Sequence, residues 1–337
     1  MIPFGALSSC TELQNVIIPN SVTLIKGYAF ENCTSLTNVT IPSSVETVDK
    51  YAFTNCTSLS NLTISNGVIT LADNVFNGCS SLKQVVVPDS VTSIGSSAFA
   101  NCSNIESITV PFTGSGSSSI THFGYIFGAG AYSDNDKYVP TSLKTVIVSD
   151  KCTSIPAYAF EYCNYLTNVI LSNNVKTIGK YAFRECTYLK EITFSNTLTS
   201  IGMYAFYECT FLEKISLPKS LTTIDEQAFR YCESLTEVII PDSVTTLGSY
   251  AFCNCTALTQ LTISEGLTTI GYGAFRYCAA LKTVMLPKSI KTIGTYAFDS
   301  CTSLTDVYYG GTKNDKNSIT YNSDNKPLVN ATWHYSE

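Results

Sequence analysis

Cysteine far outnumbers histidine among the residues that could bind metal or act as a nucleophile in this chain, which has 14 cysteines and only 2 histidines in 337 residues. Twelve of the cysteines recur with a 23-residue period, in two runs: Cys10, Cys33, Cys56, Cys79 and Cys102, then Cys163, Cys186, Cys209, Cys232, Cys255, Cys278 and Cys301. Thiols can pair as disulfides, bind metal or act as nucleophiles, so their spacing decides which chemistry is available.

The constant spacing argues against chemistry at these thiols. So long an interval is not a zinc-binding pattern, and equivalent positions in a repeat predict one buried column of small apolar side chains. Neighbouring turns could still bring two Cα atoms within disulfide range, so pairing stays open. Cys152 replaces a core valine, whereas Cys253 occupies a column that is usually polar and is predicted to be the most exposed thiol.

No other group of residues predicts catalysis or a cofactor. The two histidines, His122 and His334, are far apart, and the sequence has no GxSxG, HExxH or phosphate-binding glycine loop. Asp134 and Asp136 could contact a cation, but a solvated loop is the favoured interpretation. We therefore expect no enzyme activity, no metal and no cofactor.

The overall composition excludes two further classes of function. A net charge of −6 provides no basic stripe for nucleic acid. No run of 18 apolar residues is present, so the sequence predicts no membrane-spanning segment. Charged residues are only 14% of the chain, below the roughly 25% of ordinary domains, and Ser, Thr, Asn and Tyr supply the surface instead. Such a surface suits an extracellular protein.

The thiols belong to a 23-residue unit, and a fixed period of this size predicts a solenoid. The apolar positions of one unit are Leu36, Val39, Ile41, Val45, Val48, Ala52, Phe53 and Cys56. The LxxVxI segment predicts a short half-buried strand, which Pro42 ends because proline cannot donate to a ladder. The segment from Ala52 to Cys56 is predicted to be a helical turn.

A nearly complete phenylalanine column predicts a stacked aromatic core. Its members are Phe30, Phe53, Phe76, Phe99, Phe127, Phe160, Phe183, Phe206, Phe229, Phe252, Phe275 and Phe298. Glycine is frequent before the Ala-Phe pair, but Pro156 occupies the same column and cannot adopt a positive φ. We therefore interpret this column as a tight turn.

The repeats predict one solenoid over residues 1–337, with thirteen strand-bearing turns and three irregular segments. Residues 1–10 match the second half of a unit, which suggests a piece of a longer protein or one without its export signal. Residues 112–140 contain two Gly- and Ser-rich loop insertions. Residues 305–337 predict a C-terminal cap, in which Tyr308 and Tyr309 occupy the last strand and Trp333 and Tyr335 cover the core.

The consensus LxxVxIPxSVxxIGxYAFxxCTS resembles the BspA-like (Treponema-type) leucine-rich repeat family over essentially the whole chain. The resemblance implies an α/β, strand-rich, right-handed and curved solenoid with a parallel sheet on its concave face. It also implies a secreted or surface-displayed bacterial protein of the adhesin type, located outside the cell or on its surface, with a host or bacterial extracellular protein as partner.

Two sets of surface residues depart from the repeat and are candidate partner-binding sites. Aromatic residues replace small ones at Tyr162, Tyr165, Tyr188, Tyr207, Phe211 and Tyr231, and the outward strand face carries Thr193, Ile239 and Met285. Exposed aromatic clusters often mark binding surfaces, although these rings could instead cover the joints between turns. We expect a non-enzymatic protein-binding scaffold. The alternative is a structural spacer within a larger surface protein, with no partner of its own.

Overall fold

The computed structural model describes residues 1–116, 119, 121–321 and 323–336. Ser117, Ser118 and Ile120 of the predicted insertions, and Asn322 and Glu337 of the predicted cap, lie outside these residues. The chain divides into two compact units. The first comprises residues 1–152 and 159–170, and the second comprises residues 153–158 and 171–337.

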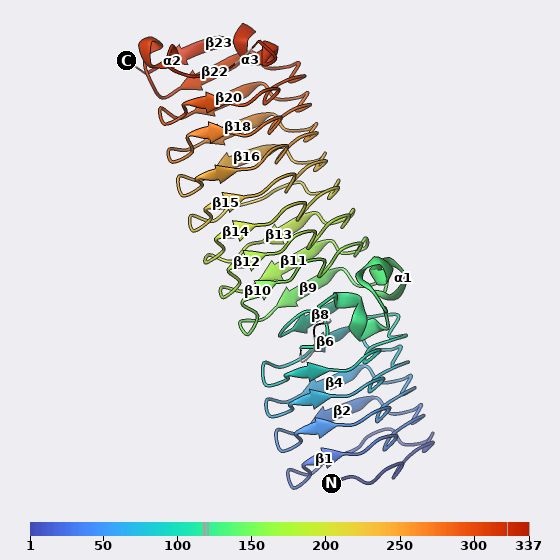
Figure 1. Cartoon of the computed structure of the whole chain (residues 1–337). Coiled ribbons are helices and arrows are strands. Elements are labelled where there is room, and N and C mark those ends of the chain that lie inside the picture. The colour runs from blue at the N-terminus through green and yellow to red at the C-terminus, as the bar shows by residue number, and fades with distance from the viewer. Residues whose placement is uncertain (117–118, 120, 322, 337) are drawn as a thin grey trace. The chain divides into compact units, whose positions relative to one another are not determined.

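Each unit is a parallel-sheet solenoid, and together they contain about 13 turns roughly 23 residues apart. Most turns contribute a strand of three or four residues and a second strand of two (Figure 1). The longer strands of the first unit are β2 (Asn38–Ile41), β4 (Asn61–Ile64), β6 (Gln84–Val86), β8 (Ser107–Val110), β9 (Thr145–Val148) and β11 (Asn168–Leu171), whose last residue falls in the second unit. Those of the second unit are β13 (Glu191–Thr193), β16 (Glu237–Ile240), β18 (Gln260–Ile263), β20 (Thr283–Leu286), β22 (Asp306–Tyr309) and β23 (Thr332–Tyr335).

The second, two-residue strand of each turn comes from the Val45–Val48 type of apolar pair, which the sequence marked as buried without predicting a strand. In the first unit these strands are β1 (Leu24–Ile25), β3 (Thr47–Val48), β5 (Thr70–Leu71) and β7 (Ser93–Ile94). In the second unit they are β10 (Ser154–Ile155), β12 (Thr177–Ile178), β14 (Ser200–Ile201), β15 (Thr223–Ile224), β17 (Thr246–Leu247), β19 (Thr269–Ile270) and β21 (Thr292–Ile293).

The predicted strand pattern is confirmed by β2 and its neighbour β4. Val39 and Ile41 are buried while Asn38 and Thr40 are exposed, as the period of two along a strand requires. The two strands are parallel, and their register is offset by one repeat, so that Ile41 lies opposite Ile64. Because of this offset, each column of the repeat forms one line across the sheet.

The Ala-Phe-to-Cys segment is a set of tight turns, so the predicted helical turn is wrong. Tyr28 and Asn32 have positive φ angles of 61° and 56°, and the N–H of Cys33 donates to the carbonyl of Phe30, three residues back. The N–H groups of Tyr28, Phe30 and Asn32 reach the next turn instead. Because alternate N–H groups bond to a neighbouring turn, the i to i−4 pattern of an α-helix cannot form.

The phenylalanine column is buried, as predicted. Within the second unit, the rings from Phe183 to Phe298 stack on one another with centroids 5.0–5.6 Å apart. At the interruption of the repeat in the first unit the column uses two phenylalanines. The N–H of Phe99 donates to the carbonyl of Ile126, next to the predicted and buried Phe127, whereas Phe123 donates its N–H to Ala159 and packs against Phe160 at 4.9 Å.

The cysteine column lies beside this core. Cys33 to Cys301 of the column are buried, whereas Cys10 in the first turn is exposed. Most of these thiols donate to the carbonyl oxygen of the residue 26 positions earlier, for example Cys232 to Phe206 at 3.3 Å. Burial raises the pKa of Cys33 to about 11 and those of Cys102 and Cys301 to about 12. These thiols therefore stay protonated at neutral pH and serve as hydrogen-bond donors within the core.

Cys253 is also buried, with 1% of its surface exposed, so the prediction that it is the most exposed thiol is wrong. Its column is half-buried in most turns and carries Arg230 and Arg276 in the two adjacent ones. Burial raises the pKa of the Cys253 thiol, and the two arginines oppose this. The residue types of the column did not reveal this burial, because most members of the column are polar and half-buried. Cys152 is buried, as predicted.

Glycine precedes the Ala-Phe pair because adjacent turns approach closely there. A Cβ at Gly95 would lie 2.3 Å from the backbone nitrogen of Asp73, and one at Gly248 would lie 2.4 Å from that of Glu226. Neither glycine has a positive φ, so the interpretation as a tight turn is confirmed and close approach is its physical reason.

The irregular segments contain more structure than predicted. The second insertion includes the 3₁₀ turns η1 (Phe123–Phe127) and η2 (Tyr132–Asp134) and the helix α1 (Asn135–Tyr138). Buried Asn135 accepts a hydrogen bond from the N–H of Gly124 and donates to the carbonyl of Glu161, which fixes this segment to the turn that follows it.

The C-terminal segment adds a further strand to the sheet. Helices α2 (Lys313–Lys316) and α3 (Lys326–Asn330) follow β22, and β23 then pairs parallel with β22. The prediction that Tyr308 and Tyr309 form the last strand is therefore wrong. The signal was weak because the spacing from Tyr308 to its partner His334 is longer than one repeat. Trp333 and Tyr335 are half-buried on this strand.

Candidate functional site

Five outward-facing residues form one line across the longer strands of the second unit, and we call this line the strand-face stripe. The register places Ile239, Thr262, Met285, Tyr308 and His334 next to one another on β16, β18, β20, β22 and β23. The prediction from sequence included Ile239 and Met285 in this surface. It missed Tyr308 and His334, which it assigned to the cap.

The stripe exposes large side chains to solvent. The exposed fractions are 53% for Ile239, 44% for Met285 and 45% for Tyr308. The Thr262 hydroxyl donates to the Met285 sulfur at 3.5 Å, and the rings of Tyr308 and His334 stack with centroids 4.5 Å apart. An isoleucine and a methionine on the same line as a stacked aromatic pair make a surface that is apolar and adaptable, as binding surfaces rich in Met are.

A polar column runs beside the stripe. Its residues are Glu237, Gln260, Thr283, Asp306 and Thr332. The Nε2 atom of His334 lies 2.7 Å from Oδ1 of Asp306, which fixes the orientation of the imidazole over Tyr308. The hydrogen bond from His334 lowers the pKa of the Asp306 carboxyl, with a further contribution from Thr305.

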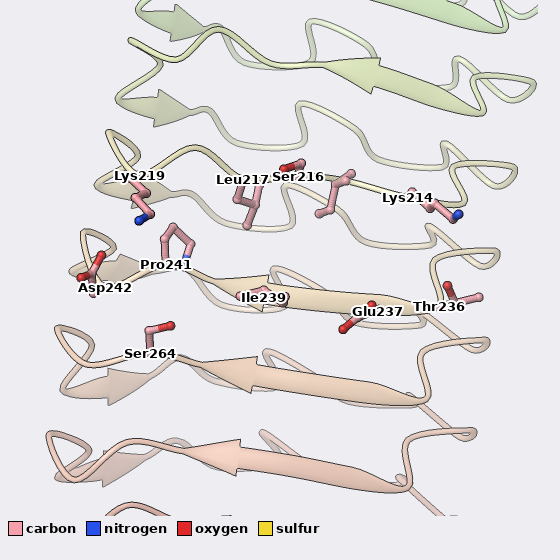
Figure 2. Close-up of a pocket in the computed structure, with 11 residues that line it drawn as sticks. Lys214, Ser216, Leu217, Lys219, Thr236, Glu237, Ile239, Pro241, Asp242 and Ser264 are labelled. Atoms are coloured by element: carbon pink, nitrogen blue, oxygen red, sulfur yellow. The ribbon is translucent and has the colours of Figure 1, made fainter.

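A groove of about 600 Å³ adjoins the Ile239 end of the stripe (Figure 2). It is lined by Lys214, Ile215, Ser216, Leu217, Lys219, Thr236, Glu237, Ile239, Pro241, Asp242 and Ser264. A second hollow of about 370 Å³ adjoins Met285, Tyr308 and His334 and shares Ser264 with the first. Cavities of several hundred Å³ are within the range that ligands occupy.

The groove lies where the parallel sheet is interrupted. β16 is the first strand of its sheet, followed by β18, β20, β22 and β23. The preceding turn, residues 214–217, is joined to β13 by a single bridge between Glu191 and Lys214. Ile215 and Leu217 of this turn are half-buried, whereas Val238 at the column of Ile215 is fully buried. We call this feature the sheet-opening groove. Thr193 is exposed on β13, beyond the interruption and outside the sheet that carries the stripe.

The predicted aromatic residues form contacts within each unit. In the second unit Tyr188 stacks on Phe211 at 5.2 Å, and Tyr207 meets Tyr231 edge to face at 5.4 Å. We call these four residues the aromatic ridge. In the first unit Tyr165 is 40% exposed, with the ammonium group of Lys144 5.4 Å from its ring, and Tyr162 is half-buried.

The rings of the ridge are largely engaged by neighbouring side chains. The guanidinium of Arg184 lies 5.9 Å from the ring of Tyr207, and that of Arg230 lies 4.8 Å from the ring of Tyr231. Tyr188 and Phe211 remain 48% and 44% exposed. Burial raises the pKa of Tyr207 to about 12, together with the charge of Glu208. The ridge thus covers joints between turns and leaves mainly the Tyr188–Phe211 pair available to a partner.

Side chains that could ligate a metal lie apart from one another in the described part of the chain. Over those residues, no three or more His, Cys, Asp or Glu side chains come together as a metal site would require. Asp134 is engaged with Lys137 at 2.8 Å. In the same residues, no helix is both long enough and apolar enough to cross a membrane.

Short strands stacked at a fixed offset, with a buried apolar column and an open strand face, define a leucine-rich repeat scaffold. The chain belongs to the BspA type leucine-rich repeat family, whose sequence pattern matches residues 1–122, 134–254 and 222–325. Leucine-rich repeat scaffolds are generally not enzymes and generally bind proteins.

Several solved structures resemble the chain. The leucine-rich repeat protein of T. pallidum is 30% identical to this chain, with a TM-score of 0.45. The match covers 48% of this chain and 77% of the T. pallidum chain. A leucine-rich repeat protein from Bacteroides ovatus is 25% identical over 96% of this chain and 92% of its own, with a TM-score of 0.42. The pneumococcal vaccine antigen PcpA is 19% identical over 96% and 79%, with a TM-score of 0.39. No curated protein matches the chain.

Proposed function

We propose that this protein is a secreted or cell-surface binding scaffold of the adhesin type, and that the strand-face stripe is the surface that contacts an extracellular protein partner. The observation that carries the proposal is the exposure of Ile239, Met285 and Tyr308 in one register line. The core does not need these side chains, because several other turns carry threonine or serine at the same outward position, such as Thr40 and Ser216.

The physical reason is the cost of leaving apolar side chains in water. Covering such a residue is worth about 1.5–3 kcal/mol when burial is complete, and a few well-covered residues dominate most interfaces. The stripe supplies an aliphatic, a thioether and an aromatic side chain for the apolar centre of an interface. The polar residues beside it can form hydrogen bonds at the rim of that interface. An extended sheet surface of this kind is what solenoid proteins commonly use to bind partners.

The test is a binding screen against a panel of purified extracellular proteins, with the double variant Met285→Ser, Tyr308→Ser as the comparison. We expect at least one protein to bind the unmodified chain and to bind the variant at least about tenfold more weakly, since hot-spot residues contribute about 2 kcal/mol or more. Serine is tolerated at outward strand positions, so the melting temperature should fall only slightly, by what the surface stack of Tyr308 on His334 contributes. If the partner binds the double variant as tightly as the unmodified chain, the stripe is not its binding surface.

The spacer alternative makes the opposite prediction, because a spacer binds no protein of the panel, whether or not the stripe is substituted.

The aromatic ridge remains a second candidate surface for binding the partner. It is carried by the exposed Tyr188–Phe211 stack, whose rings have no counterpart at Ser58 and Ser303 in the same column. Substituting Tyr188 and Phe211 together by serine tests it, and a loss of affinity without unfolding would support the ridge.

A further inference from the structure

The charged residues around the sheet-opening groove are arranged by sign. Lys214 and Lys219 lie on the turn that precedes β16, and Glu237 and Asp242 lie on the turn that contains it. Each lysine precedes one of the carboxylates by one repeat, so the groove has a cationic bank and an anionic bank. Figure 2 shows Lys214 and Lys219 above the level of β16, with Glu237 and Asp242 at its two ends.

These four side chains do not pair across the groove, although the same offset produces ion pairs elsewhere. Lys190 and Glu213 approach to 4.0 Å, and Lys83 and Glu106 approach to 3.5 Å, and the members of each pair are one repeat apart. Within the described residues, the side chains of Lys214, Lys219, Glu237 and Asp242 form no ion pair or hydrogen bond. For Lys214 and Glu237 the interruption of the sheet explains the difference, since residues 214–217 do not pair with β16.

The floor between the banks is apolar. Ile239 is 53% exposed, and Pro241 lines the groove beside it. A ligand that fits must therefore carry both signs of charge, one toward each bank, and must cover an aliphatic side chain. A polymer of one charge would be repelled by one bank, and an uncharged ligand would leave both banks unpaired.

We propose that the sheet-opening groove binds an extended peptide segment in which acidic and basic side chains alternate. This inference rests on the proposed function as a protein-binding scaffold and names the chemistry of the segment that is bound. Successive side chains of an extended strand point to opposite sides, so one set meets the lysine bank and the alternate set meets the carboxylate bank. Lys214 and Lys219 mark the two ends of the cationic bank, and a short extended peptide of about six residues could contact both.

The test compares two fluorescently labelled peptides of identical composition. One has the sequence Ser-Asp-Lys-Asp-Lys-Asp-Lys-Ser, and the other is the block isomer Ser-Asp-Asp-Asp-Lys-Lys-Lys-Ser. Both are neutral overall, so only the order of the charges differs. We expect fluorescence anisotropy to show at least about fivefold tighter binding of the alternating peptide, and the difference should shrink in high salt because screening weakens exposed ion pairs.

Variants of the full chain assign the preference to the groove. Glu237→Gln with Asp242→Asn removes the anionic bank while keeping side-chain shape, and Lys214→Ser with Lys219→Ser removes the cationic bank. Each should abolish the preference for the alternating peptide. The matched control is Lys190→Ser with Glu213→Ser, which removes an ion pair of the same offset outside the groove and should keep the preference. Equal binding of the two isomers, no binding of either, or a preference that survives both groove variants would overturn the proposal.

The result is separable from that for the proposed function. Met285 and Tyr308 lie outside the groove, so the variant Met285→Ser, Tyr308→Ser should retain the peptide preference while losing the protein partner. If only the peptide test fails, peptide binding by the groove is rejected and protein binding by the stripe stands. If only the stripe test fails, protein binding by the stripe is rejected and peptide binding by the groove stands.

Discussion

The phenylalanine column and the strand-face stripe of the second unit are each made by one position of the repeat, yet they differ in what their residues share. The column from Phe183 to Phe298 keeps one residue type, fully buried and stacked on its neighbours. The stripe has five residue types at five consecutive positions, and three of its side chains are about half exposed. A position that packs against its own copies must stay constant, whereas an outward position is free to be shaped by something outside the chain.

The largest effect should follow from breaking the constant column. Phe206→Ala removes a fully buried ring that stacks on Phe183 and Phe229 and contacts Phe194 edge to face. We expect a loss of about 3–5 kcal/mol in the free energy of unfolding, measured by urea denaturation. A melting temperature equal to that of the unmodified chain would contradict a stacked aromatic core.

The second-largest effect should be a loss of folding stability at high pH. Burial raises the pKa of Cys102 and Cys301 to about 12, above the value near 9 expected for an unfolded thiol. Their contribution to stability is complete below about pH 9 and is lost as the pH rises toward 12, because the unfolded state then releases thiol protons that the folded state retains. Thermal melts at pH 7 and pH 10.5 should show the loss.

Serine at these positions provides the matched control for the alkaline effect. Cys102→Ser together with Cys301→Ser keeps a donor for the carbonyl oxygens of Phe76 and Phe275 but does not ionise in this range. The double variant should lose less stability between the two pH values than the unmodified chain. An identical loss in both proteins would show that other groups cause the alkaline effect.

Substitutions in the aromatic ridge should reduce folding stability less than Phe206→Ala or high pH does. Tyr188→Ser with Phe211→Ser removes one stacked pair at the surface, worth about 0.5–1.5 kcal/mol beyond buried area. We expect a small decrease in melting temperature and no change in affinity for the protein partner. A loss of affinity without a change in melting would place the partner on the ridge instead of the stripe.

Much of this architecture follows from the sequence because the length of the repeat is both the period of the sequence and the offset of the sheet register. Ile239 and Met285 could be recognised as surface residues for that reason, since Val238 and Val284 beside them keep the core pattern. Tyr308 and His334 were missed because β23 follows β22 at more than one repeat length, outside the period.

Two features could not be predicted from the columns at all. Cys253 is buried although most members of its column are half-buried, and the mostly polar residues of that column did not indicate it. The sheet-opening groove depends on the lack of backbone pairing between residues 214–217 and β16. The sequence there, EKISLPKS, keeps the repeat pattern and gives no sign of the interruption.

The central claim is that the stripe binds protein and that the core does not depend on it. The most direct measurement is the affinity of the partner found in the panel for the Met285→Ser, Tyr308→Ser variant, with melting temperature followed in the same samples. The account predicts at least about tenfold weaker binding with at most a small decrease in melting temperature. Unchanged affinity, or a loss of affinity that accompanies unfolding, would contradict it.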